Sequence, residues 1–312
     1  MSEVNQTKVK EFLLTGFQNL NIFNNMLFIA FILIYVLTLS FNVMIISLVA
    51  KFQNLKSPMY FFLTHLSMTD ILLTTNITPN MLHVVIKGGS TIRVSGCITQ
   101  FFFYGASATT ECLLLTVMSY DRYVAICSPL HYTTIMNFGH CLHLALWSWL
   151  LSCTISLIIA CLIRVLVFCG PHIIDHYFCD FAPLVELSCS DSTVVEMVDF
   201  LLSIPLVVFP LFFILFTYVA IFLTIFRIPS TSGKQKAFST CSSHLIVVST
   251  YYGTLITVYM VPSKGQSFNV NKLMSLLYTV GTPCLNPLIY SLRNKDIKEA
   301  FRKWTKSFSR YK

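Results

Sequence analysis

"FFFYGASATTECLLLTVMSYDRYVAIC", residues 101–127, is the stretch of this sequence that says most about the fold. Only one charged side chain, Glu111, precedes the acid and base that stand side by side at Asp121 and Arg122. About 20 apolar residues are enough to cross the roughly 30 Å of hydrocarbon in a bilayer. The stretch therefore predicts a membrane-spanning helix with an acid–base pair at one end.

The composition of the whole chain agrees with a membrane protein. Of its 312 residues, 55% are hydrophobic and 11% are charged, which is more apolar side chain than one soluble core can bury. Backbone groups in hydrocarbon must pair within a helix or a closed barrel, and these apolar runs are too long and continuous for alternating barrel strands. We therefore expect helices.

Polar residues, proline and glycine separate the apolar runs into seven predicted helices. They cover residues 24–50, 58–83, 96–127, 141–163, 194–228, 236–261 and 268–292. The sequence thus predicts an all-α membrane protein with three parts. These parts are an outer tail (1–23), a seven-helix bundle (24–292), and a cytoplasmic amphipathic helix and tail (293–312).

Lys and Arg residues gather on one side of the predicted bundle. That side holds Lys51, Lys56, Arg227, Lys234, Lys236, Arg293, Lys295, Lys298, Arg302, Lys303, Lys306 and Arg310. The positive-inside rule makes it cytoplasmic and leaves the N-terminus outside. The net charge of +8 follows from this topology and gives no reason to expect nucleic-acid binding.

Two Asn-x-Thr triplets bear on the same topology. "NQT" at Asn5 lies on the predicted outer tail, where it is a candidate glycosylation site. "NIT" at Asn76 falls inside the second predicted span, so we expect it to carry no glycan.

Four of the eleven cysteines lie on the predicted outer side. They are Cys97, Cys169, Cys179 and Cys189. Thiols pair in an oxidising compartment, so we expect disulfides, one of which ties the loop of residues 168–191 to the third helix. A zinc site is the alternative, with ligands Cys169, His172, His176 and Cys179. Disulfides account for all four cysteines, whereas zinc leaves two over.

Polar side chains inside the predicted spans form one layer. Asp70 and Glu111 lie roughly 16 to 18 Å from the inner end of their helices, and Asn42 and Asn286 reach similar depths. Two carboxylates close together in low dielectric repel, so either one keeps its proton or a hard cation such as sodium lies between them. The alternative is a hydrogen-bonded cluster that only fixes helix packing.

Five motifs in register resemble those of olfactory receptors, a branch of the rhodopsin-like G-protein-coupled receptors. The first is "MSYDRYVAIC" (118–127). The others are "LKSPMYFFL" (55–63) with "LSMTD" (66–70), "SPLHYTTIM" (128–136), "KAFSTCSSHL" (236–245) and "PCLNPLIYSLRN" (283–294). The resemblance extends from the first span to the tail.

The resemblance implies roles for individual residues. Asp121 would hold Arg122 at rest, and Tyr218 and Tyr290 would turn inward on activation. The implied switch residues are Asp121, Arg122, Tyr123, Tyr218, His244, Asn286, Pro287 and Tyr290. The resemblance also implies a sodium ion at Asp70 and Glu111, and disulfides that pair Cys97 with Cys179 and Cys169 with Cys189.

A ligand site is expected in the outer half of the bundle, where helical periodicity brings small and aromatic residues onto single faces. The candidates are Phe101, Tyr104, Gly105, Ala108, Thr109, Leu202, Ser203, Leu206, Val207, Tyr252, Leu255, Ile256, Tyr259, Leu276 and Thr279. They offer apolar surface, a few hydroxyls and no charge, and Tyr104 occupies the level where aminergic relatives keep an acid. Ordinary helix packing is the alternative. The preferred ligand is therefore small, neutral and largely apolar.

The cytoplasmic side is basic and amphipathic. Residues 227–244 read as a short basic loop leading into the sixth helix. In the tail, Ile297, Phe301, Trp304 and Phe308 form one apolar stripe among Lys and Arg residues. Such a helix lies on the inner leaflet of the membrane.

Taken together, these observations predict an odorant receptor of the plasma membrane. Its expected partners are a volatile ligand and membrane lipids, and the resemblance implies an olfactory, stimulatory heterotrimeric G protein that raises cyclic AMP. No nucleophile, base and orienting group converge in the chain, so we do not expect an enzyme. Two alternatives are an ectopic chemosensor for a metabolite and an ion-coupled transporter or channel; against the latter, the sequence has no inverted repeat.

Overall fold

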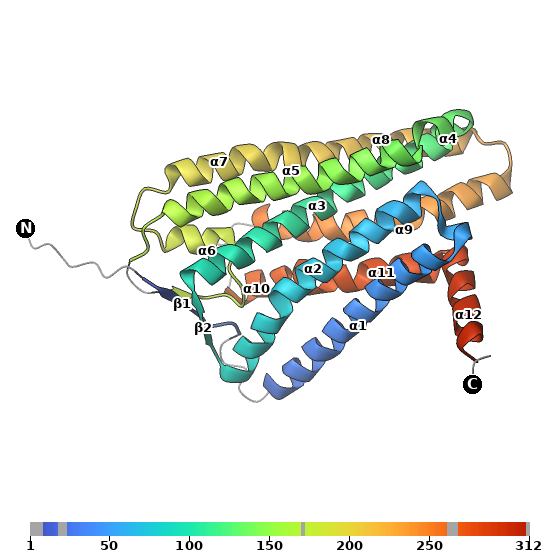
Figure 1. The fold of residues 1–312 in the computed structure, drawn as a ribbon. Helices are drawn as coiled ribbons and strands as arrows, with labels where there is room; N and C mark the ends of the chain where they lie inside the picture. The colour runs from blue at the N-terminus through green and yellow to red at the C-terminus, as the bar shows by residue number, and fades with distance from the viewer. Residues whose placement is uncertain (1–8, 18–23, 170–171, 261–267, 310–312) are drawn as a thin grey trace, which may run out of the picture.

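Seven helical segments lie side by side in an elongated bundle (Figure 1) in the part of the chain that the computed structural model describes, residues 9–17, 24–169, 172–260 and 268–309. The first four are α1 (Asn24–Lys51), α2 (Pro58–Lys87), α3 (Val94–Cys127) and α5 (Phe138–Val165). The fifth comprises α7 (Thr193–Ser203), η3 (Ile204–Val208) and α8 (Phe209–Arg227). The sixth is α9 (Thr231–Met260), and the seventh comprises α10 (Phe268–Leu276), η4 (Leu277–Gly281) and α11 (Thr282–Arg293). The predicted all-α, seven-helix bundle is confirmed.

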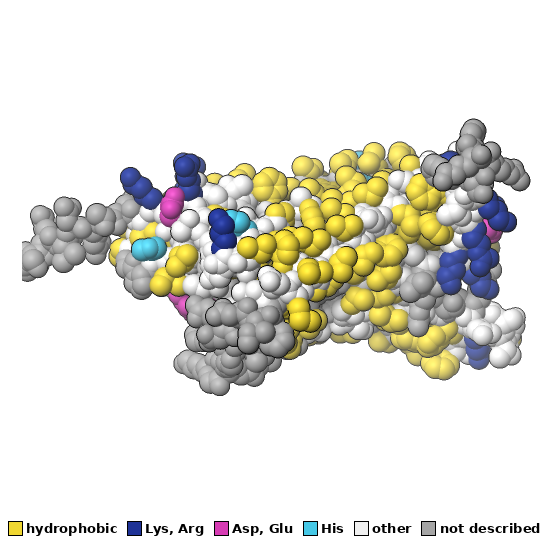
Figure 2. Space-filling model, turned by 90° about the horizontal axis from the view of Figure 1, so that it is seen from below, with side chains coloured by type: hydrophobic (Ala, Val, Ile, Leu, Met, Phe, Trp, Pro, Cys, Tyr) yellow, Lys and Arg dark blue, Asp and Glu magenta, His cyan; other side chains and the backbone are white. Residues whose placement is uncertain are grey.

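The helices differ in how deeply they lie in the bundle. Four described helical segments are long and apolar enough to cross a membrane on length and hydropathy alone: α1, α3, α5 and the fifth segment. In an apolar stretch of 18 residues, 56% of the residues of α3 are buried inside the protein, against 22% in α1. α3 therefore occupies the centre of the bundle. Figure 2 shows apolar side chains along the middle of one face and Lys and Arg side chains at its two ends, as expected for a protein that spans a bilayer.

Local sequence signals set several helix ends. Ser57 precedes Pro58 at the start of α2, where proline's missing N–H costs nothing. The same helix ends at Gly88, whose φ of 67° is left-handed. The Asn137 side chain accepts a hydrogen bond from the His140 N–H at 2.9 Å and caps α5.

The sixth helix begins earlier than predicted. The sequence placed its start at residue 236, but α9 starts at Thr231, so most of the expected basic loop is helical. The connection from α8 is only residues 228–230. The error has a physical reason, because hydropathy marks where hydrocarbon begins and a helix continues into water wherever its polar side chains are solvated.

Two of the seven segments contain a π-helical turn. η3 contains Pro205 in the fifth segment, and η4 interrupts the seventh. A π turn inserts one extra residue and rotates the helix faces on either side of it. Hydrophobic periodicity did not predict either turn.

A small sheet covers the end of the bundle that the sequence predicts to be the outer end, and the sheet itself was not predicted. Its strands are β1 (Glu11–Leu14), β2 (Ser90–Arg93) and β3 (Ile173–Ile174), in the order β2–β1–β3. β1 pairs antiparallel with β2 and parallel with β3. Such short strands depend on partners far away in the sequence, which local patterns do not report.

Shorter elements complete the described chain. They are η1 (Gln53–Leu55), η2 (Pro129–His131), α4 (Tyr132–Ile135), α6 (Phe181–Glu186) and α12 (Lys295–Ser309). α12 lies at the end of the bundle opposite the sheet, which the sequence predicts to be cytoplasmic (Figure 1). Its Ile297 is 1% exposed, whereas Phe301 is 40% exposed, so only part of the predicted apolar stripe is buried in the protein.

Candidate functional site

Three parts of the chain meet at Tyr104 in the outer half of α3. Its hydroxyl lies 2.6 Å from the hydroxyl of Tyr278 in the seventh segment. Its ring packs edge-on against Phe178 of the second outer loop, with ring centroids 5.1 Å apart. Tyr104 thus joins the third helix, the seventh helix and the loop.

The seventh segment presents consecutive residues to the bundle. Tyr278, Thr279 and Val280 are all buried, because they lie in the π turn η4. Thr279 donates to the Ser275 carbonyl at 2.7 Å, and its hydroxyl lies 3.0 Å from that of Tyr177. Thr279 was predicted to face inward, but Tyr278 was missed because an α-helical period places only one of two neighbours inside.

A thiol links two other predicted ligand residues. The Cys112 thiol donates to the Leu206 carbonyl at 3.0 Å and lies 2.9 Å from the Tyr252 hydroxyl. The sequence analysis did not single out Cys112, which connects the third, fifth and sixth helical segments. The neighbouring Tyr251 was also missed, and its hydroxyl donates to the Ala108 carbonyl at 2.8 Å.

Other candidates lie away from this cluster. A Cβ atom at Gly105 would approach the Ser156 Oγ to 3.1 Å, so Gly105 allows α3 and α5 to pack closely. The Ser203 hydroxyl donates to the Phe200 carbonyl of its own helix, and Ile256 is 46% exposed.

The remaining candidates are buried or half-buried. Phe101 is 6% exposed. Those of intermediate burial are Thr109, Leu202, Val207, Leu255 and Leu276. The Tyr259 side chain and Asn5 lie outside the described residues.

The outer loop adds a buried acid that the sequence analysis did not consider. Asp180 is 9% exposed and accepts a hydrogen bond from the Phe181 N–H at 2.8 Å, at the start of α6. Burial raises the pKa of Asp180 to about 6, although the bond from Phe181 lowers it. Its position at a helix start gives this carboxyl a structural role.

Two disulfides fix the same loop. Cys97 is joined to Cys179 and Cys169 to Cys189, the pairing that the resemblance implies. The zinc alternative is wrong, because two of its four ligands are in disulfides. The residues that the structure describes contain no cluster of three or more metal-binding side chains.

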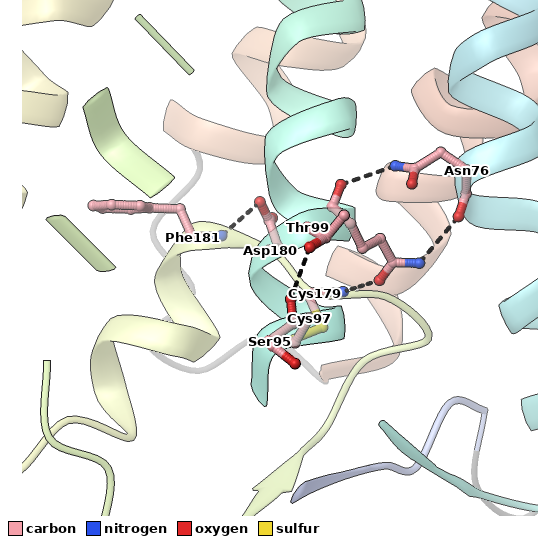
Figure 3. The surroundings of a disulfide bond; sticks show 8 residues. Asn76, Ser95, Cys97, Thr99, Cys179, Asp180 and Phe181 are labelled. Atoms are coloured by element: carbon pink, nitrogen blue, oxygen red, sulfur yellow. Dashed lines mark hydrogen bonds between the residues drawn. A yellow bond between two sulfur atoms is a disulfide. The ribbon is translucent and has the colours of Figure 1, made fainter. Parts of the chain in front are cut away.

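Gln100 holds the backbone beside the first disulfide. Its side-chain oxygen accepts from the Cys179 N–H at 3.0 Å, and its side-chain nitrogen donates to the Asn76 carbonyl at 3.2 Å. The Asn76 side chain donates to the Gln100 carbonyl at 2.9 Å, and Figure 3 shows Asn76 facing α3 near Cys97. Asn76 is thus engaged between two helices, which fits the expectation that it carries no glycan.

Three of the four residues in the predicted polar layer contact one another. The Asn286 amide donates to Asp70 Oδ1 at 3.1 Å and to Glu111 Oε1 at 2.9 Å. Asp70 and Glu111 are each 1% exposed. Asn42 lies differently, since its amide donates to the carbonyls of Thr38 and Pro283.

The donor set suits a hard cation. Carboxylate and amide oxygens are the ligands that such ions prefer. Asp70 and Glu111 supply carboxylates, and Asn42 Oδ1 is buried with no hydrogen-bond partner among the described residues. The residues therefore fit a sodium ion chemically.

A second polar cluster lies at the cytoplasmic end of α3. Asp121 is fully buried and Arg122 is 9% exposed. The Arg122 guanidinium pairs with Asp121 Oδ2, with Nε at 2.8 Å. The Tyr132 hydroxyl of α4 donates to the other oxygen, Oδ1, at 2.8 Å. Burial and the Asp121 charge raise the pKa of Tyr132, so the hydroxyl keeps its proton and remains a donor.

At this end of the bundle, one histidine of the sixth helix contacts both the third and the fifth helical segments. His244 Nδ1 lies 2.6 Å from the Tyr218 hydroxyl, and its Nε2 lies 3.1 Å from the Leu115 carbonyl. Tyr290, in α11 with Pro287, is 1% exposed, and its hydroxyl has no partner among the described residues.

Tyr123 is half-buried beside this cluster. The structure thus brings Asp121, Arg122, Tyr218 and His244 into direct pairs and adds Tyr132, which the sequence analysis missed because its partner lies in another element.

Comparisons with known proteins agree along nearly the whole chain. A family model described as olfactory receptor matches residues 31–306. Human olfactory receptor 6B1 is 45% identical over 299 residues, which cover 96% of each chain. Human olfactory receptor 11L1 and mouse olfactory receptor 5G29 are both 46% identical over 303 residues, covering 97% of this chain and 94% and 96% of their own.

Proposed function

The chain belongs to the olfactory receptor family, and on this premise we propose that it binds a small, neutral, largely apolar volatile ligand inside the helix bundle and activates an olfactory, stimulatory heterotrimeric G protein that raises cyclic AMP. The family consists of multi-pass plasma membrane receptors and not of enzymes.

One observation carries the proposal: a single helix contributes to the contacts at both ends of the bundle. α3 contributes Tyr104 to the outer cluster, which also contains Tyr278 and Thr279. It contributes Arg122 to the cytoplasmic cluster, which also contains Asp121 and Tyr132. Tyr104 and Arg122 are separated by about 27 Å along the helix axis, at about 1.5 Å per residue. A ligand that changes the packing at the outer end can therefore act on the cytoplasmic end through one rigid element.

The chemistry of the outer cluster supports a neutral ligand of low polarity. The hydroxyls of Tyr104, Tyr252 and Thr279 already have partners within the protein. A ligand that competes for them must replace a bond that exists, so affinity comes mainly from apolar contact, with one or two polar groups fixing orientation.

Signalling then requires two conformations with different affinities for the ligand. An outward movement of the cytoplasmic end of α9 must break the contact between His244 and the Leu115 carbonyl. Exposure of Arg122 to a G protein must break its pair with Asp121. A ligand shifts the population of the open form by no more than its differential affinity for the two forms.

The proposal includes a sodium ion held by Asp70 and Glu111 in the closed form. Two buried carboxylates that share one amide donor support it. Bound sodium would offset one of the two negative charges of the acids. The alternative is a proton retained on one of them.

The sodium part has its own test. Activation of the receptor is measured in sodium buffer and in choline buffer. We expect the parent chain to respond to the exchange and Asp70→Asn or Glu111→Ala to lose that response. A salt response unchanged in both variants would leave these acids with a packing role only.

We further propose that the N-terminus lies outside the cell and α12 lies on the inner leaflet. The basic residues at the α12 end and the disulfides at the opposite end support this orientation. The half-exposed Phe301 beside Arg302 and Lys303 suits a membrane surface.

The test of the main proposal is a cyclic AMP assay. Cells that express the chain and the olfactory G protein are exposed to a panel of volatile compounds. We expect ligand-dependent cyclic AMP that Arg122→Ala abolishes at unchanged surface level, while Arg164→Ala at the far end of α5 has no effect. Ion current through purified protein in liposomes, without cyclic AMP, would contradict the proposal and favour a channel.

A further inference from the structure

A buried lysine at the outer end of the seventh segment has no role in the function proposed above. Lys272 is 2% exposed. Its ammonium donates to the Gly16 carbonyl at 2.8 Å and to Asp175 Oδ1 at 2.5 Å. A buried charge requires such partners, because leaving it unpaired costs much free energy. One side chain therefore joins the N-terminal segment, the second outer loop and the seventh helix.

The acid in this contact serves two donors. Asp175 Oδ1 also accepts from the Thr15 hydroxyl at 2.8 Å. Partial burial opposes ionisation, but the hydrogen bonds from Lys272 and Thr15 hold the pKa of Asp175 below its usual value. Asp175 is thus charged at neutral pH and pairs with Lys272 as an ion.

The N-terminal segment is paired with the loop along its length. The N–H groups of Leu13, Thr15 and Gly16 donate to the carbonyls of His172, Ile174 and His176 at 2.7, 3.1 and 3.2 Å. Phe12 and Leu14 are 0% and 1% exposed, so the underside of the segment is packed. Figure 1 shows β1 and β2 at the outer end of the bundle, near α6 and α10.

The loop is held to the seventh segment at two levels. Lys272 holds Asp175, and seven residues further along the helix Thr279 lies beside the Tyr177 hydroxyl. Seven residues correspond to about 10 Å along a helix. Tyr177 also stacks on Phe17 of the N-terminal segment, with ring centroids 5.6 Å apart. The segment thus lies above the cluster of Tyr104, Tyr278 and Thr279.

We propose that residues 9–17 form a strap that keeps the second outer loop closed over the ligand site, and that Lys272 is the positioning residue that fastens the strap to the seventh helix. The proposal rests on the proposed function in taking the outer cluster as the ligand site. A ligand or reagent that passes between the outer solution and the bundle interior must wait for the strap to open.

The experiment measures opening of the strap without any odorant. Cysteines are introduced separately by Leu14→Cys, on the buried face of the strap, and by Ala108→Cys, in the outer half of α3. Intact cells are treated with a membrane-impermeant methanethiosulfonate ammonium reagent, and the labelling rate of the surface receptor is measured. The parent chain without either substitution gives the background.

Lys272→Met keeps the bulk of the side chain and removes its hydrogen bonds. We expect it to raise the labelling rate at both cysteines by about tenfold, as the loss of hydrogen bonds to a charged group predicts. Lys272→Arg keeps the charge and donors and should leave both rates close to those of the parent. Lys87→Met removes an exposed charge at the same end of the protein and should also change neither rate.

Two results would overturn the proposal. Labelling that is unchanged at both cysteines would mean that Lys272 does not fasten the strap. Labelling that rises at Leu14→Cys but not at Ala108→Cys would mean that the strap does not close the interior. Thr15→Val, which removes one hydrogen bond to Asp175, is judged by the same criteria if Lys272→Met fails to reach the surface. A failure of the odorant proposal is seen separately, as absent cyclic AMP with labelling changed as expected.

Discussion

Tyr132→Phe should raise the activity of the receptor in the absence of ligand. The Tyr132 hydroxyl donates to the same Asp121 carboxylate that pairs with Arg122. Its loss weakens the closed form, in which Asp121 holds the arginine, and leaves the open form unaffected. Tyr132 was not among the predicted switch residues, so the result tests the geometry of the cytoplasmic cluster independently of the family resemblance.

The size of the effect follows from the contact. A hydrogen bond to a charged group contributes about 1.5–3 kcal/mol when buried, and Tyr132 is half-exposed, so about 1 kcal/mol is a suitable estimate. That free energy changes the ratio of open to closed receptor by about fivefold. If about 1% of the receptors are open at rest, about 5% will be open in the variant.

The assay is basal cyclic AMP, divided by the amount of receptor at the cell surface. Tyr120→Phe is the matched control, because Tyr120 lies in the same part of α3, faces the His140 ring, and forms no hydrogen bond through its hydroxyl among the described contacts. Basal cyclic AMP in Tyr132→Phe equal to that of the parent and of the control would refute the reasoning.

Three further predictions concern the outer end. Gly16→Ala should sharply reduce surface expression, since its φ is 59° and a Cβ would lie 2.3 Å from a side chain of α2, whereas Gly88→Ala meets nothing within 4 Å and should cost only about 1–2 kcal/mol of backbone strain. Gln100→Leu leaves buried backbone groups unpaired and should lower the free energy of unfolding by about 3 kcal/mol, measured as a lower thermal midpoint; an unchanged midpoint would contradict its bridging role. Burial lowers the pKa of His176 to about 3, so the unfolded chain takes up a proton at this residue before the folded chain does. The contribution of the neutral imidazole to the free energy of unfolding is therefore complete above about pH 6.5. It decreases as the pH falls toward 3, by up to about 1.4 kcal/mol per pH unit. His176→Gln should therefore weaken the fall in thermal midpoint between pH 7 and 5, and His172→Gln, in an exposed position, should not.

The sequence predicted the features that depend on the membrane and on composition. Seven helices follow from seven apolar runs, because hydrocarbon leaves the backbone no alternative. The four outer cysteines and the buried acids were also found, since Asp70 and Glu111 are conspicuous in apolar helices. Each of these signals lies within one segment.

The features that the sequence did not reveal depend on pairs of distant segments or on small changes in helix geometry. The sequence analysis did not single out Lys272, because its partners are residues 16 and 175. Tyr278 enters the cluster through a π turn that periodicity cannot detect. Ile256 and Gly105 were predicted to line the ligand site, but Ile256 is 46% exposed and Gly105 lies against Ser156 of α5.

The outer sheet has a consequence for biosynthesis. β1 leaves the ribosome first, but Thr15 must wait for Asp175, 160 residues later, and Gly16 for Lys272, 256 residues later. At about 5–20 residues per second, translation delays the last of these contacts by roughly 13–50 s. The first strand gains its two neighbours in the sheet earlier, once residues 90–93 and 173–174 have been made, so the contact with Lys272 forms last. Formation of the contact between Gly16 and Lys272 would thus report that the seventh helical segment is in place.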